Sequence, residues 1–252
     1  MKKIRTVIVT HDEPLFLRKT LEGIFANCSD LDPICIIEGP PPKMIDGHSI
    51  IKRGTSVLKT FGILAFAFYS YKLIKNKISQ FFGSNPNYIK CEIKRVPSVN
   101  SAESIAIMSD LEPDLILSVL AGEIFKRDII NIPPLGILNV HTGQLPKYKG
   151  LMPTFWALKN NEPKIGISTF LVNEIIDGGK VLGYHEIDSL HTSHFELMER
   201  VYEELWISIN VAVKNIINNE EIIFNDFLPE QYFSAPKKND VDDFLASGGK
   251  LF

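Results

Sequence analysis

The sequence predicts an α/β protein with a Rossmann-like, mostly parallel sheet, helices on both faces, and a long C-terminal helix followed by a strap. Apolar runs of strand length alternate with longer segments whose apolar residues recur at helical spacing. No two runs are joined by a tight hairpin turn, so each strand is expected to return through a crossover and pair in parallel. We expect residues 1–190 to form one domain and residues 191–252 a helix and tail packed on it.

Length and composition favour an ordinary globular protein. The chain has 252 residues, 45% of them apolar and 23% charged, with a net charge of −3, which is enough for a sizeable core and too acidic to favour nucleic acid as a partner. Its three cysteines are scattered, as in proteins of a reducing compartment. The basic N-terminus is followed only by a strand-length apolar run, so no signal peptide is predicted and a cytoplasmic location is expected.

The first half contains three predicted strands and three predicted helices. The first strand ends in a turn, Thr10 to Pro14, that has no Gly-x-Gly pattern, so a phosphate-binding glycine loop is not supported there. Ser101 is placed to cap a helix on which Ser104 and Asp110 should face solvent. The strands are expected at residues 4–9, 34–37 and 88–96, and the helices at 15–25, 50–82 and 101–111.

One apolar segment, residues 61–71, allows two interpretations. It is far shorter than the roughly 20 residues of a membrane-spanning helix. The first interpretation is a helix buried against the sheet. The second is an amphipathic helix that rests weakly on an anionic membrane surface, because basic residues flank it on both sides. These basic residues are Lys52, Arg53, Lys59, Lys72, Lys75 and Lys77.

The second half continues the alternation. Gly122 turns the chain into a short helix, and Ser193 with Glu196 has the Ser-x-x-Glu form of a capping box at the start of a long helix. The tail from residue 227 carries aromatic residues and is expected to pack as a strap. The strands are expected at residues 115–120, 137–140, 165–172 and 181–187, and the helices at 153–159 and 193–217.

Polar residues stand where the strand at 137–140 ends. Asn139 and His141 are two residues apart, so they share one face of the strand. Gly143 and Pro146 then stop the strand. Buried amides and imidazoles need partners, and the carboxyl edge of a parallel sheet is where α/β proteins bind ligands. The sequence therefore predicts a functional site at this strand end.

These residues carry a resemblance to a known family. Asn139-Val140-His141, followed by Leu145-Pro146 and Lys149-Gly150, resembles the Asn-x-His … Leu-Pro-x-x-Arg-Gly signature of the formyltransferases. The loop at 173–179, Asn-Glu-Ile-Ile-Asp-Gly-Gly, resembles the family's Asp-Glu-Gly-Ile-Asp-x-Gly, and residues 119–124 resemble the strand end that lines the folate pocket. The resemblance implies that residues 1–190 are a catalytic domain that uses N10-formyltetrahydrofolate as cosubstrate, without a metal.

The resemblance also implies roles for individual residues. Asn139 and His141 would donate hydrogen bonds to the oxyanion that forms when an amine attacks the formyl carbon, and Asp177 would favour the charged imidazole and relay a proton. The cofactor-binding residues would be Val119, Leu120, Ala121, Gly122, Ile124, Glu174 and Ile175. The substrate-binding residues would be His11, Asp12, Lys147, Tyr148, Lys149 and Gly150.

Departures from the family pattern narrow the expected acceptor. Gly143 stands where the family usually has serine, and Lys149 where it usually has arginine. Lysine keeps the positive charge but lacks the planar guanidinium that binds a carboxylate or phosphate through two hydrogen bonds. The glycine-rich loop of the glycinamide ribonucleotide enzymes is missing, and too little sequence follows the last helix for the nucleic-acid-binding domain of the tRNA enzymes. No regulatory domain of the hydrolase type precedes the first strand. The sequence is thus most similar to the sugar N-formyltransferases and to compact members of the family whose substrate is not known, with a nucleotide-linked amino sugar as the expected acceptor.

Other functions stay open at this point. A formyl-folate hydrolase would use water in place of the amine, and another amine formyltransferase, of the glycinamide ribonucleotide type, would use a different acceptor. A non-catalytic folate-binding or membrane-surface module would use the 61–71 helix. A homodimer is also left open. A zinc site at His185, His191 and His194 lacks a completing ligand, and a serine hydrolase lacks the Gly-x-Ser-x-Gly elbow.

Overall fold

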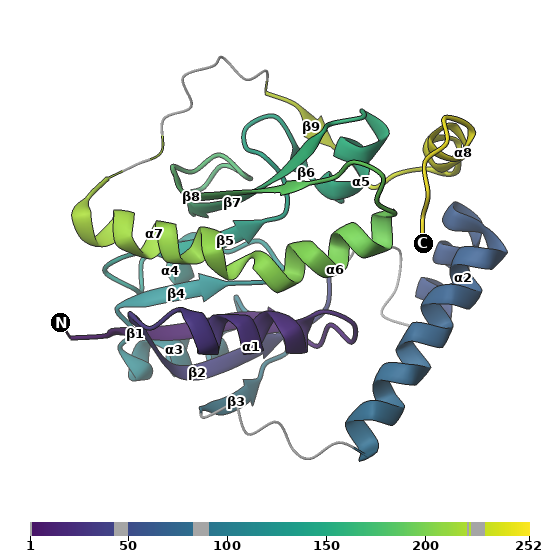
Figure 1. The fold of residues 1–252 in the computed structure, drawn as a ribbon. Helices are drawn as coiled ribbons and strands as arrows, with labels where there is room; N and C mark the ends of the chain where they lie inside the picture. The colour runs from purple at the N-terminus through teal and green to yellow at the C-terminus, as the bar shows by residue number, and fades with distance from the viewer. Residues whose placement is uncertain (1, 43–49, 83–90, 221, 223–229) are drawn as a thin grey trace.

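The computed structural model of the protein describes residues 2–42, 50–82, 91–220, 222 and 230–252, and places most of its strands in one seven-stranded sheet (Figure 1). The strand order is β3-β2-β1-β4-β5-β7-β8. The strands are β1 (Ile4–His11), β2 (Leu31–Gly39), β3 (Glu92–Arg95), β4 (Leu115–Ser118), β5 (Ile137–His141), β7 (Lys164–Leu171) and β8 (Val181–Asp188), with β6 (Lys149–Gly150) and β9 (Tyr232–Phe233) in a small second sheet. The helices are α1 (Leu17–Asn27), α2 (Ile50–Phe82), α3 (Ala102–Leu111), α4 (Arg127–Ile130), α5 (Pro153–Lys159), α6 (His194–Glu204), α7 (Trp206–Asn218) and α8 (Lys238–Ala246).

The mostly parallel sheet is confirmed, with one difference at its edge. The strands from β3 to β5 pair in parallel, whereas β7 pairs antiparallel with both β5 and β8. The connection from β7 to β8 contains no helix, so the chain reverses directly into an antiparallel partner. The expectation that each strand returns through a crossover and pairs in parallel is therefore wrong for two pairs, β5–β7 and β7–β8.

Helices cover both faces of the sheet, as predicted. Helices α1, α6 and α7 pack on one face, where Ile8 and Leu117 join one apolar core. Helices α3 and α4 pack on the other face, where Met108 and Ile129 meet Val7 and Ile116 in a second core. Alternate side chains of β1 and β4 thus pack into two different cores, one on each face of the sheet, as expected of strands buried on both sides.

Several local expectations are corrected by packing. Ser104 is fully buried instead of facing solvent, because it lies one turn before Met108 on the side of α3 that meets the sheet. The Ser101 cap and the exposed Asp110 are confirmed. The helix expected at 193–217 begins with the predicted Ser193–Glu196 capping box, but it is divided into α6 and α7 at Leu205. Residues 88–90 of the strand expected at 88–96 lie outside the described residues.

Helix α2 is not buried against the sheet. In Figure 1 it stands beside the sheet, next to α8 and the C-terminus. Its backbone is broken at Gly62, whose φ of 86° and ψ of 175° suit glycine. The stretch from Gly54 to Ile78 is long and apolar enough to cross a membrane by length and composition, so the expectation that this segment is far too short is wrong by that measure. Only 6% of its most apolar part is buried. The first interpretation of this segment is wrong, because the α2 side chains reach α6 and the tail instead of the strands.

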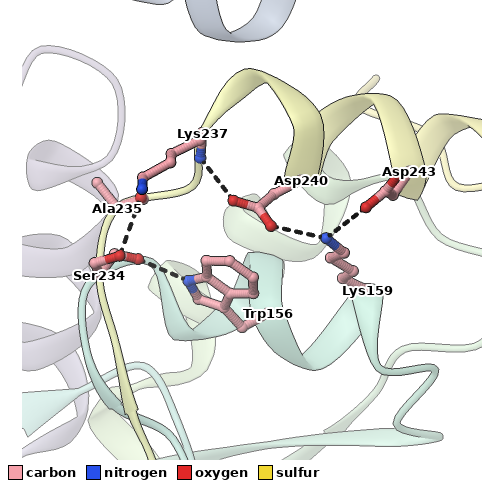
Figure 2. Close-up of polar contacts among 7 residues, drawn as sticks. All are labelled: Trp156, Lys159, Ser234, Ala235, Lys237, Asp240 and Asp243. Atoms are coloured by element: carbon pink, nitrogen blue, oxygen red, sulfur yellow. Dashed lines mark hydrogen bonds and ion pairs between the residues drawn. The ribbon is translucent and has the colours of Figure 1, made fainter.

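The C-terminal tail packs on α5 as a strap, and it contains a helix that the sequence analysis did not predict. Figure 2 shows the indole of Trp156 donating a hydrogen bond to the carbonyl of Ser234, at 3.0 Å. The ammonium of Lys159 lies 2.9 Å from Asp240 and 3.4 Å from Asp243 on α8. Asp240 also accepts from the backbone N–H of Lys237 at 2.9 Å, which closes the first turn of α8. The strap is thus held by polar contacts as well as by its aromatic residues.

His194 makes the stability of the fold sensitive to acid. Burial lowers the pKa of His194 from 6.5 to about 4, and its Nδ1 atom has no partner among the described residues. The unfolded chain takes up this proton near pH 6.5 while the folded chain resists it. We expect the free energy of unfolding to be unaffected by this group above pH 6.5, and to fall by on the order of 3 kcal/mol as the pH drops to about 4.

The substitution His194→Phe tests this expectation, because it keeps a ring against Phe155 and removes the titrating group. Urea unfolding between pH 7 and 4 should show a shallower loss of stability in this variant than in the native chain. His191→Asn, at an exposed histidine, is the matched control and should keep the native slope. If the free energy of unfolding falls with pH equally steeply in His194→Phe and in the native chain, His194 is not the source of the acid sensitivity.

Candidate active site

The predicted site residues gather where the strand order of the sheet reverses. From β1 the sheet continues through β2 and β3 on one side and through β4 and β5 on the other. The carboxyl ends of the central strands therefore meet at a topological switch point, the usual place for ligand binding in such sheets. His11 ends β1, Ser118 ends β4, and His141 ends β5. These three residues are far apart in the sequence, and they come together because β1, β4 and β5 are neighbours in the sheet.

Asn139 is oriented by a serine from the neighbouring strand. Ser118 and Asn139 are partners in the β4–β5 register, and the Ser118 hydroxyl donates to Oδ1 of Asn139 at 2.6 Å. Because Oδ1 is already engaged, the Nδ2 group is the end of the amide that remains to donate. It has no hydrogen-bond partner within the described part of the chain. Ser118 was not singled out from the sequence, since it lies in another strand and belongs to no motif with Asn139.

His141 is held in a single orientation by its Nε2 atom. This atom lies 2.5 Å from the carbonyl oxygen of Tyr148, which can only accept, so Nε2 carries the hydrogen. The other ring nitrogen, Nδ1, lies 4.0 Å from Oδ2 of Asp177. Both side chains are largely buried, with 8% and 13% of their surfaces exposed. The proton that can move on this imidazole is therefore the one at Nδ1, beside a carboxylate.

Asp177 is itself held by a hydrogen bond from the backbone of β6. Its Oδ2 atom accepts the N–H of Gly150 at 2.9 Å, and its own φ is 49°. Gly150 belongs to β6, which pairs with β9 of the strap. The loop at 173–179, the strand end and the C-terminal strap are thus joined at one carboxylate, and the arrangement of His141 and Asp177 depends on all three.

The turn after β5 is pinned by Ser168 of β7, another residue that the sequence analysis did not single out. The buried Ser168 hydroxyl donates to the carbonyl of Gly143 at 2.8 Å and accepts from the N–H of Leu145 at 3.0 Å. A Cβ atom on Gly143 would lie 2.5 Å from Cβ of Pro153. The serine usual in the family at this position would therefore not fit without a shift of α5. The only sequence signal for Ser168 is a polar residue within an apolar strand.

The residues expected to bind the cofactor lie on two loops that approach each other. Arg127 at the start of α4 lies 3.6 Å from Glu174 in an exposed ion pair. Nδ1 of His11 donates to the carbonyl of Leu120, which joins the ends of β1 and β4. Ile124 and Ile175 are exposed apolar residues on these loops, with exposed fractions of 68% and 65%. The two loops therefore offer apolar surface beside the site.

Several of the residues expected to bind substrate already contact carboxylates of the protein. The Lys147 ammonium lies 2.5 Å from Glu162, and the Tyr148 hydroxyl donates to the same carboxylate at 2.7 Å. Lys149 is buried, and its ammonium lies 2.6 Å from Glu230 in the strap. Asp12 is exposed. Any substrate contact by the two lysines would have to share or replace these carboxylates.

The three histidines of the possible zinc site have different surroundings. His185 lies 2.8 Å from Glu204, His194 is buried beside Thr154, and His191 is exposed. No group of three or more His, Cys, Asp or Glu side chains in the described part of the chain is arranged to hold a metal ion.

Known proteins resemble the chain in sequence and in fold. A methionyl-tRNA formyltransferase of Kosmotoga olearia is 31% identical over 148 residues, which are 59% of this chain and 48% of that relative. The chain thus spans about half the length of this curated relative.

Two solved structures share the fold. An N-formyltransferase from Helicobacter canadensis, in complex with folinic acid and dTDP-3-aminofucose, has a TM-score of 0.54 at 18% identity and covers 93% of this chain and 71% of its own. Glycinamide ribonucleotide transformylase 1 from Symbiobacterium toebii has a TM-score of 0.58 at 14% identity, and the match covers 88% of this chain and 92% of its own.

The family model described as formyl transferase matches residues 71–209, more than half of the chain. This range includes the Asn-x-His strand end, the 119–124 turn and the loop that carries Asp177. The chain belongs to the formyl transferase family.

Proposed function

We propose that the protein transfers a formyl group from N10-formyltetrahydrofolate to a primary amine, and that this amine belongs to a nucleotide-linked amino sugar. The observation that carries the proposal is the convergence of the amide of Asn139, the imidazole of His141 and the carboxylate of Asp177 at the end of β5. Bound formyl-folate would supply the formyl carbon. The exposed Ile124 and Ile175 beside the site suit the apolar part of such a ligand.

The proposed chemistry assigns one task to each of the three side chains. Nδ2 of Asn139 donates to the formyl oxygen as negative charge develops on it, and Nδ1 of His141 supplies a second donor. Asp177 stabilises the charged imidazole and accepts, through water, the proton that the attacking amine loses. The same proton returns through water to N10 as the bond between N10 and the formyl carbon breaks, so that tetrahydrofolate leaves and the formylated amine remains. The hydrogen bonds from Ser118 and to Tyr148 hold the amide and the ring in these orientations before substrate arrives.

The start of α1 disfavours glycinamide ribonucleotide as the acceptor. The N-terminus of a helix that follows a strand is a common phosphate site. Here the carboxylate of Glu13 already accepts the N–H groups of Leu15, Phe16 and Leu17, at 3.0, 2.5 and 3.2 Å. A phosphate at this place would have to displace a carboxylate that closes the helix. While Glu13 stays in place, the phosphate of glycinamide ribonucleotide would have to bind at a position other than the start of α1.

The charge of the chain and one fold neighbour support a small acceptor. A protein that binds tRNA needs many basic side chains for the phosphate backbone, whereas this chain carries 27 Lys and Arg against 30 Asp and Glu. The Helicobacter canadensis neighbour holds a dTDP-linked amino sugar. A nucleotide-linked amino sugar would place its amine at the Asn139–His141 strand end.

The experiment is a release assay with the full chain. N10-formyltetrahydrofolate is supplied with dTDP-linked and UDP-linked amino sugars, with glycinamide ribonucleotide, and with initiator methionyl-tRNA in separate reactions, and tetrahydrofolate and formate are both measured. We expect tetrahydrofolate release that depends on an amino-sugar nucleotide, without formate. Release with one of the other two acceptors would keep formyl transfer and refute the sugar. Formate without any acceptor would identify a hydrolase, and no release in any reaction would refute the proposal.

A further inference from the structure

The outward side of α2 carries a continuous apolar stripe. Beyond Gly62, exposed residues recur at intervals of four, four, three and four, which places them on one side of a helix. Leu64, beside the stripe, and Ile74, within it, are 73% and 59% exposed. Patches of large exposed apolar residues on a protein mark contact sites. The α2 stripe consists of Ile63, Ala67, Tyr71, Ile74 and Ile78.

The opposite side of α2 is attached to the protein. Ala65 is buried in a small core with Phe155, Val241, Phe244 and Leu251. The ring of Phe68 packs edge-on against Phe195 at 5.0 Å and stacks on Phe252 at 4.6 Å, and the ammonium of Lys72 lies 4.3 Å above the Phe195 ring. Asn76 donates to the carbonyl of Pro14. These contacts fix the rotation of the helix, so the stripe faces outward in the folded protein.

The charged side chains of α2 between Gly54 and Ile78 have one sign, and Lys72, on the attached side, lies 3.9 Å from Glu199 of α6. Between Gly54 and Ile78 the sequence has lysines at 59, 72, 75 and 77 and no acidic residue, in a chain whose net charge is −3. Lys59, Lys75 and Lys77 are exposed. The three acidic side chains of neighbouring α8 are engaged, Asp240 and Asp243 by Lys159 and Asp242 by Lys238. An apolar stripe bordered by lysines matches an anionic lipid surface, whereas a second copy packed stripe to stripe would bring like charges together.

The sheet topology excludes a membrane-spanning arrangement. Helix α2 lies between β2 and β3 in the sequence, and these strands are parallel neighbours, with Cys35 opposite Glu92. A single span would leave the two strands on opposite sides of the membrane. Because the fold joins them, α2 can meet a bilayer only while lying along its surface.

We propose that the α2 stripe binds an anionic lipid bilayer in the plane of its surface, with Lys59, Lys75 and Lys77 at the level of the head groups. The site at the end of β5 would then work beside a membrane. This inference is independent of the acceptor, because it rests on α2 alone.

The test is co-sedimentation of the full chain with vesicles of phosphatidylcholine and phosphatidylserine in a ratio of about 7:3, and with pure phosphatidylcholine vesicles, at about 0.15 M salt. We expect binding to the anionic vesicles that weakens with added salt. The double substitution Leu64→Gln and Ile74→Gln should lower the partition coefficient roughly tenfold or more, because it removes two large apolar side chains. Lys75→Gln with Lys77→Gln should lower it on anionic vesicles by a similar factor.

The matched control is Leu190→Gln with Ile217→Gln, which removes two exposed apolar side chains that lie outside α2, with exposed fractions of 59% and 41%. This control should bind vesicles as the native chain does. Urea unfolding of every variant separates loss of binding from loss of folding, and substitutions at exposed positions should change stability little.

Three results would overturn the proposal. The first is no sedimentation with anionic vesicles, or equal sedimentation of the native chain and the α2 variants. The second is a lipid-free dimer in analytical ultracentrifugation that the Leu64→Gln and Ile74→Gln variant converts to a monomer, because this would identify the stripe as an interface between two copies. The third is resistance of the bound protein to alkaline carbonate extraction, which would indicate a span.

Discussion

The substitution Asn139→Ala is expected to lower turnover of the formyl-transfer reaction by roughly 100- to 1000-fold, with the fold intact. The amide is held with its Nδ2 group as the remaining donor, and a donor aimed at a developing oxyanion acts in the transition state more than in the ground state. The effect should therefore fall on kcat, with little change in KM for either substrate. Steady-state release of tetrahydrofolate, with the acceptor found in the release assay, provides the measurement.

The matched control for this prediction is Ser118→Ala. Ser118 contacts Asn139 through a 2.6 Å hydrogen bond and is fully buried. As a positioning residue it should affect kcat far less, about fivefold, which corresponds to the loss of one neutral hydrogen bond. Turnover of Asn139→Ala within a few-fold of the native rate would remove the amide from the proposed chemistry. Equal losses in the two variants would show that Asn139 acts only through the local structure that it shares with Ser118.

The substitution His141→Ala is expected to lower turnover at least 100-fold, because it removes both the second donor and the group that carries a proton at Nδ1. Since Nε2 is occupied by the Tyr148 carbonyl, the lost function is that of Nδ1. Free imidazole added to the variant should restore part of the rate in a concentration-dependent way. His191→Ala, at an exposed histidine, should keep native turnover and gain nothing from imidazole.

The substitution Asp177→Asn separates charge from structure at the same site. Asparagine can still accept the Gly150 N–H, which in the native chain reaches Oδ2 at 2.9 Å, so the loop should keep its place while the negative charge beside His141 is lost. Turnover should fall roughly 100-fold or more, and the pH dependence of kcat should change with it. A variant with the native pH profile and near-native turnover would assign Asp177 a purely structural role.

Local patterns predicted much of this fold. The apolar runs located the strands, and residues 153–159 were predicted as a helix with the bounds that α5 has. The caps at Ser101 and Ser193 were found from their own residue types. These features depend on neighbours along the chain, so the sequence reports them directly. The antiparallel β7–β8 pair and the division of the last helix at Leu205 could not be found in this way, because pairing and packing with distant segments decide them.

Residue order is enough to place an amide and an imidazole on one face of a strand end, since side chains alternate along every strand. The groups that meet them are brought in by the fold from other segments: Ser118 from β4, the Tyr148 carbonyl, and Asp177, held by Gly150. The fold also turns an apolar helix outward instead of against the sheet. The physical reason is the same in both cases. Periodicity records which residues share a face of one element, whereas strand register and long-range packing select what that face touches.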